Sequence, residues 1–195
     1  MLDSRPGSDS WQNELSPVLR VHQIVVAALL TGCLMFLVIT LVIGSSVAEG
    51  MEQESTLITF TSLGFAVVAL LVRTVVSGVI VARGRRSILR GTWRLPRGRD
   101  GQPISAEFIE RTGDAGKLAV LSLQRTIVGA AVLEGAAFFT LVAYLIEQSP
   151  LALGAAALLI VGVGLHFPTQ GRLVQWIADQ LTLLEQERLM GVSHS

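Results

Sequence analysis

Hydrophobic positions in this chain gather into four long runs and do not alternate with polar positions. The first run covers residues 24–43 and the fourth covers 151–167, and neither contains an acidic residue, lysine or arginine. The second run, 57–82, and the third, 126–146, each contain one charged residue. A helix of about 20 apolar residues rises roughly 30 Å, which matches the hydrocarbon core of a bilayer. Because backbone groups in lipid must be satisfied within their own segment, the pattern predicts four transmembrane helices.

Turn and cap residues mark the ends of these runs. Ser16–Pro17 is typical of a helix start, and residues 147–150 (Glu-Gln-Ser-Pro) predict a tight turn followed by a new helix. The expected fold is therefore all-α, an integral membrane bundle of four helices within 16–167, after a mobile tail at 1–15. Apolar positions at helical spacing in 168–195 predict a C-terminal amphipathic helix.

Composition excludes several classes of protein. Hydrophobic residues make up 51 % of the 195 residues and charged residues only 15 %, whereas a soluble domain carries about 25 % charged residues. A soluble enzyme, a disordered protein and a nucleic-acid-binding module are thereby excluded. The single cysteine, Cys33, excludes a disulfide framework. Phosphate-binding loops and metal-binding motifs are absent from the sequence, so we expect no enzyme activity, no catalytic residue, no cofactor and no metal site.

The basic residues predict the orientation in the membrane. Of the 15 lysines and arginines, 14 fall on one side of the predicted spans, ten of them in the stretch 83–125. By the positive-inside rule, both termini and the loop 83–117 are expected in the cytoplasm. The first half of that loop carries seven arginines and no acidic residue. We expect these arginines to bind anionic lipid headgroups and not nucleic acid. They are Arg83, Arg85, Arg86, Arg90, Arg94, Arg97 and Arg99.

The two charged residues within the runs are the candidate functional site. Arg73 lies ten residues from Arg83 and Glu134 lies nine residues from Arg125, so both fall at a depth of roughly 14–15 Å on consecutive antiparallel helices. A charge within a span is costly, which predicts an Arg73–Glu134 ion pair. Small residues at helical spacing would let the two helices approach. They are Ala66, Ala69 and Ser77 in the second run, and Ala130, Ala131 and Ala137 in the third.

Residues 124–144 resemble the carboxylate helix of the rotor-ring (c) subunit of rotary ATP synthases. In this segment Glu134 is followed directly by Gly135 and then by the aromatic residue Phe138. This resemblance implies an ion-carrying role for Glu134. A second resemblance, to a group of small, uncharacterised bacterial proteins with four spans, rests on Arg125-Thr126, Glu134-Gly135-Ala136, Phe138 and Phe167-Pro168-Thr169. That second resemblance implies a bacterial inner-membrane protein of unassigned activity.

Two functions follow from these patterns. In the first, the chain is a non-enzymatic inner-membrane component in which Arg73 and Glu134 fix the packing of the helices. In the second, it handles protons or cations as part of a channel or transporter, and Glu134 is the ion-binding carboxylate. A further alternative is that Glu134 faces a second copy in a homo-oligomer. His166, near the end of the fourth run, is expected at the membrane interface, and a proton relay is the alternative role.

Overall fold

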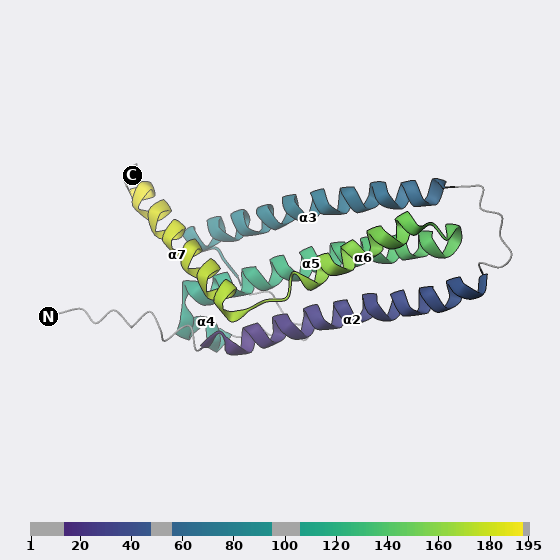
Figure 1. Ribbon diagram of the computed structural model, residues 1–195. Helices are drawn as coiled ribbons and strands as arrows, with labels where there is room; N and C mark the ends of the chain where they lie inside the picture. Colours follow the sequence, from purple (N-terminus) through teal and green to yellow (C-terminus); the bar gives the residue numbers. More distant parts are fainter. Residues whose placement is uncertain (1–13, 48–55, 95–105, 193–195) are drawn as a thin grey trace. The chain divides into compact units, whose positions relative to one another are not determined.

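The protein is built from helices throughout the part of the chain that the computed structural model describes, residues 14–47, 56–94 and 106–192 (Figure 1). In chain order the helices are α2 (Ser16–Val47), α3 (Leu57–Leu89), α4 (Ala106–Thr112), α5 (Asp114–Glu147), α6 (Pro150–Gly164) and α7 (Gln170–Val192). No strand occurs in these ranges, so the all-α prediction is confirmed for them. Three helices, α2, α3 and α5, are long and apolar enough to cross a membrane.

The fourth apolar run forms a shorter helix than predicted. Helix α6 has 15 residues and ends at Gly164, so it rises only about 22 Å. The amides of His166 and Phe167 bond to the carbonyls three residues earlier, at 3.0 Å each, which tightens the chain into a turn. Pro168 follows directly, and the residue before a proline is disfavoured in the α conformation. The predicted helical run to 167 is thus corrected to one that ends at 164.

The start of α6 agrees with the predicted turn. Gln148 adopts a left-handed backbone conformation with φ of 49°. Ser149 then takes an extended conformation at the N-cap, and Pro150 occupies the first turn of α6. Proline suits this position because its missing N–H would have no partner within the helix.

The chain divides into two compact units. The apolar unit comprises Gln23–Ser77 and Thr126–Phe167, and the charged unit comprises Met1–His22, Gly78–Arg125 and Pro168–Ser195. The long helices α2, α3 and α5 each contribute residues to both units.

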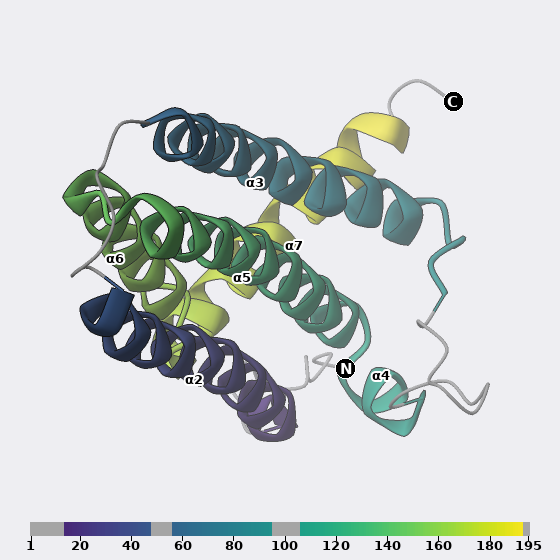
Figure 2. The same cartoon turned by 90° about the vertical axis from the view of Figure 1, so that its right-hand side faces the viewer.

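In the apolar unit, α5 lies between α2 and α3 (Figures 1 and 2). The ring of Phe138 on α5 packs edge-to-face against Phe36 of α2, with centroids 5.0 Å apart. Phe139, the next residue, packs in the same way against Phe65 of α3 at 5.3 Å. The second and third runs were predicted to be neighbours, and this contact between α3 and α5 confirms it.

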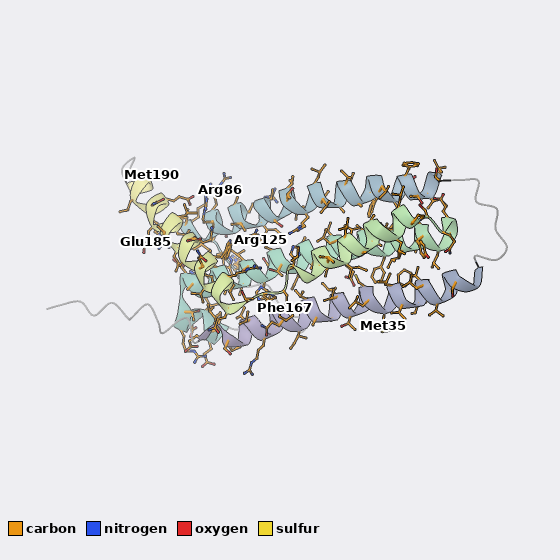
Figure 3. The ribbon with its side chains drawn as sticks, viewed as in Figure 1. Met35, Arg86, Arg125, Phe167, Glu185 and Met190 are labelled. Carbon is orange, nitrogen blue, oxygen red and sulfur yellow. The ribbon has the colours of Figure 1, made fainter. Side chains whose placement is uncertain are left out.

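Small and branched aliphatic side chains fill the interior of the apolar unit, and larger ones cover its outside. Ala69, Ala137 and Ala156 are among the buried residues of its core. Small residues allow helices to pack closely where no hydrophobic drive brings them together. Large apolar side chains face outward on every helix; Met35 on the outer side of α2 is 61 % exposed and Leu158 of α6 is 75 % exposed (Figure 3).

The charged unit has its own small hydrophobic core, to which α7 contributes Leu173, Ile177 and Leu184. Figures 1 and 2 show α7 crossing the end of α3 and the start of α5. Ion pairs surround this core: Asp114 accepts from Lys117 at 2.7 Å and from Arg188 at 2.6 Å. Figure 3 labels Arg86, Arg125, Glu185 and Met190 of this unit.

Much of the predicted loop 83–117 is helical. Helix α3 continues to Leu89 and ends where Gly91 adopts φ of 65°, a left-handed conformation that glycine takes without strain. A short helix, Ala106–Thr112, follows, and α5 begins at Asp114, twelve residues before the predicted span. The first arginines of this stretch are therefore held on a helix.

Candidate functional site

Glu134 lies in the interface between α5 and α2. A Cβ placed on Gly32 of α2 would lie 3.5 Å from Glu134 Oε1 and 4.0 Å from the ring of Phe138. Gly32 therefore lies next to the carboxylate, at a distance that would still accommodate a methyl group. Cys33, the next residue on α2, is fully buried.

Arg73 reaches α5 at a different point, Gly129. A Cβ on Gly129 would lie 3.7 Å from Arg73 Cγ and 3.8 Å from Arg73 Nε. His166, which follows α6, approaches the same point, with Nε2 at 3.6 Å. Its Nδ1 donates a hydrogen bond of 2.7 Å to the carbonyl of Gly162, and this directs Nε2 toward Gly129. The structure thus brings Arg73 and His166 together over one glycine of α5.

The predicted Arg73–Glu134 ion pair stays a prediction. Gly129 and Glu134 are five residues apart on α5, or about 7.5 Å along its axis. The Arg73 side chain reaches from α3 to Gly129 of α5, whereas the Glu134 side chain reaches from α5 to Gly32 of α2. Both side chains are half-buried. The meeting of Arg73 with His166 was not expected from sequence, because the two residues are 93 positions apart and no periodicity links them.

The predicted small residues differ in their burial. Ala66, Ala69, Ala130 and Ala137 are buried, and Ser77 is half-buried. Ala131 is exposed, so the packing role predicted for it is corrected. It belongs to an exposed stripe on α5 that continues through Gly135 and Val142.

A buried carboxylate that the sequence did not single out joins α5 to α3. Glu147, the last residue of α5, is 4 % exposed. Its Oε1 accepts a hydrogen bond of 2.7 Å from the amide of Ile58, and its Oε2 accepts one of 2.7 Å from the amide of Thr59. First-turn amides have no partner within their own helix, and a negative charge there is favoured by the helix dipole. Glu147 therefore caps α3 from a neighbouring helix.

The interface between α2 and α5 also carries polar groups beyond Glu134. Thr40 of α2 is fully buried, and its hydroxyl has no hydrogen-bond partner among the described residues. One turn further, a Cβ on Gly44 would lie 3.1 Å from the side-chain amide of Gln148 and 3.5 Å from the ring of Tyr144. The Phe36–Phe138 contact lies between the level of Glu134 and that of Thr40.

The predicted headgroup-binding arginines fall into three groups. Arg83, Arg86, Arg90 and Arg94 are exposed. Arg85 is half-buried and forms an ion pair of 2.8 Å with Glu187 of α7. Arg97 and Arg99 lie outside the described residues. Within the described ranges, no group of three or more His, Cys, Asp or Glu side chains could hold a metal ion.

Comparison with known proteins finds no match to a protein-family model, to a curated protein or to a solved structure.

Proposed function

We propose that the protein is a non-enzymatic integral membrane component of the bacterial inner membrane, with four membrane-embedded helices and both termini in the cytoplasm. The observation that carries this proposal is the outer surface of the apolar unit, where large aliphatic side chains are exposed on all four helices. An apolar surface of this extent would associate in water, whereas acyl chains solvate it.

The fourth membrane crossing rests on α6. Its helical rise of about 22 Å is shorter than the hydrocarbon core, and a short span is tolerated at modest cost by local thinning of the bilayer. Its outward residues Leu151, Leu158 and Val161 are exposed and apolar, as a lipid-facing surface requires. With α6 crossing, the basic residues outside the spans all fall on the cytoplasmic side.

Cysteine labelling in intact cells tests this topology. The variants Thr56→Cys and Glu185→Cys, in a Cys33→Ala background, place one exposed thiol just before α3, on the side opposite the proposed cytoplasmic face, and one on α7. We expect a membrane-impermeant maleimide to label the first in intact spheroplasts and the second only after lysis. Labelling of both thiols before lysis would contradict the fourth crossing.

Within this component, Arg73 and Glu134 fix the packing of the bundle. Each lies at a glycine of a neighbouring helix, Arg73 at Gly129 and Glu134 at Gly32, so each defines one interhelical register. An uncompensated charge at mid-membrane costs about 2.5–3.5 kcal/mol on insertion scales. Pairing between them would offset much of that cost.

A second function, proton or cation handling through Glu134, is supported by the α2–α5 interface. Glu134, Thr40 and Gln148 face this interface at successive levels. A carboxylate can hold a proton, and carboxylate, hydroxyl and amide oxygens can all coordinate a cation. The Phe36–Phe138 contact, with centroids 5.0 Å apart, separates Glu134 from Thr40. Ion movement along this route would require the two rings to part.

Substitution of Glu134 separates the two functions. Glu134→Gln keeps the shape of the side chain and removes its charge. If the role is structural, Glu134→Gln has a lower melting temperature in detergent than the wild type. Neither the variant nor the wild type then shows ion flux in proteoliposomes. If Glu134 carries ions, the wild type shows flux, and Glu134→Gln folds normally but loses it. Glu147→Gln is the control for the flux measurement. It removes the charge of a carboxylate that caps α3, so this variant should keep its flux if Glu134 carries the ions.

A further inference from the structure

One face of α3 changes from apolar to cationic near the end of the helix. Val79 is the last large hydrophobic residue of α3 that is exposed. On the same face, the following exposed side chains are Arg83, Arg86 and Arg90. At about 100° per residue, these three arginines fall within a sector of roughly 60° that also contains Val79. The Arg90 amide still bonds to the Arg86 carbonyl at 3.1 Å, so the helical geometry extends to Arg90.

Arg85 provides a contrast on a different face of α3. Its guanidinium forms an ion pair with Glu187 at 2.8 Å and donates to Gln180 at 3.4 Å, both on α7. Arg83, Arg86 and Arg90 take part in none of the ion pairs formed within residues 14–47, 56–94 and 106–192. The helix thus directs one arginine into the protein and three outward.

We propose that Arg83, Arg86 and Arg90 form a binding site for the phosphate group of an anionic phospholipid. The lipid's acyl chains would lie toward Val79, where the exposed face is apolar. Guanidinium groups bind phosphate oxygens through paired, charge-assisted hydrogen bonds. Each basic residue near an anionic membrane surface contributes about fivefold in binding. The site rests on the proposed membrane location, and it specifies which arginines bind the headgroup and which one does not.

Native mass spectrometry of the full chain in a mild detergent tests the site. Phosphatidylglycerol and phosphatidylcholine are titrated against the wild type and against Arg86→Gln and Arg85→Gln. Each variant removes one charge, the first from the outward sector of α3 and the second from the face that contacts α7. We expect Arg86→Gln to lower the preference for phosphatidylglycerol about threefold or more, and Arg85→Gln to leave it within twofold. The triple variant Arg83→Gln/Arg86→Gln/Arg90→Gln should lower it tenfold or more. The corresponding triple lysine variant keeps the charge and loses the paired hydrogen bonds, so it should retain only part of the preference.

Several outcomes would overturn the assignment. Equal losses in Arg85→Gln and Arg86→Gln would show a nonspecific effect of net charge. Displacement of phosphatidylglycerol by millimolar inorganic phosphate would indicate a site for free phosphate. Binding of single-stranded RNA without any preference between the two lipids would indicate a nucleic-acid surface. Carbonate extraction of native membranes is a separate test: release of the protein would contradict the membrane location itself, whatever the lipid preference.

Discussion

At the scale of single residues, the most consequential contact is the one that Glu147 makes with α3. Its two carboxylate oxygens accept from two successive amides, each at 2.7 Å, in a buried position. An unsatisfied buried donor costs about 1–3 kcal/mol, more than the net gain from a typical hydrogen bond. Glu147 thus links the end of α5 to the start of α3 through two hydrogen bonds.

We predict that Glu147→Ala lowers the free energy of unfolding by about 1–3 kcal/mol, because it leaves the Ile58 and Thr59 amides without their acceptors. Glu147→Gln should cost less, since its amide oxygen can still accept one bond. The measurement is unfolding by sodium dodecyl sulfate in mixed micelles, followed by circular dichroism. Glu185→Ala, at an exposed position of α7, is the control. Equal stability of Glu147→Ala and Glu185→Ala would contradict the capping role.

At the scale of elements, glycines of α2 and α5 determine where charged side chains can enter the bundle. Gly129 admits Arg73 and His166, and Gly32 admits Glu134. In both cases a Cβ would lie 3.5 Å or more from its neighbours, an ordinary contact distance, so alanine fits. A longer side chain would have to share this space with the charged groups. The apolar runs predicted from sequence form these helices, but the runs contain many glycines and do not distinguish the two that face charged groups.

We predict that Gly129→Ala leaves the melting temperature unchanged, whereas Gly129→Leu lowers the stability by about 1–3 kcal/mol, because the larger side chain must displace Arg73 and His166. The change is measured as a shift in thermal unfolding of the purified protein. Gly154→Leu on α6 serves as the control, since no other residue lies within 4 Å of a Cβ there. A Gly129→Leu protein as stable as Gly154→Leu would show that the space over Gly129 is not filled by these side chains.

At the scale of the whole molecule, the two units follow the distribution of hydrophobic and charged residues. The apolar unit starts at Gln23 and resumes at Thr126, within one residue of the predicted starts of the first and third spans. For the second span the two boundaries differ. The apolar unit ends at Ser77 within α3, whereas the predicted apolar run continues to residue 82. Ion pairs hold α7 within the charged unit, at Asp114 and at Arg85.

We predict that Asp114→Asn speeds amide hydrogen exchange in α7 by up to about fivefold and leaves exchange in α6 unchanged. Asp114 accepts from both Lys117 and Arg188, and half-exposed pairs of this kind contribute about 1 kcal/mol or less. Exchange is followed by mass spectrometry on peptides from 170–192 and 150–164. Asp179→Asn, exposed on α7, is the control. An equal increase in both peptides would contradict the division into two units.

The sequence by itself determined the helical class, the apolar runs and the turn at 147–150, because helix periodicity, run length and proline chemistry are local properties. It also indicated Glu134 and Arg73 as unusual, since a charge within an apolar run is visible without a fold. Only the tertiary structure decided which neighbour each polar group meets: Glu147 with the start of α3, Arg73 with His166, and Arg85 with Glu187. These contacts join residues far apart in the chain, and they depend on the rotation of each helix about its axis, which packing sets.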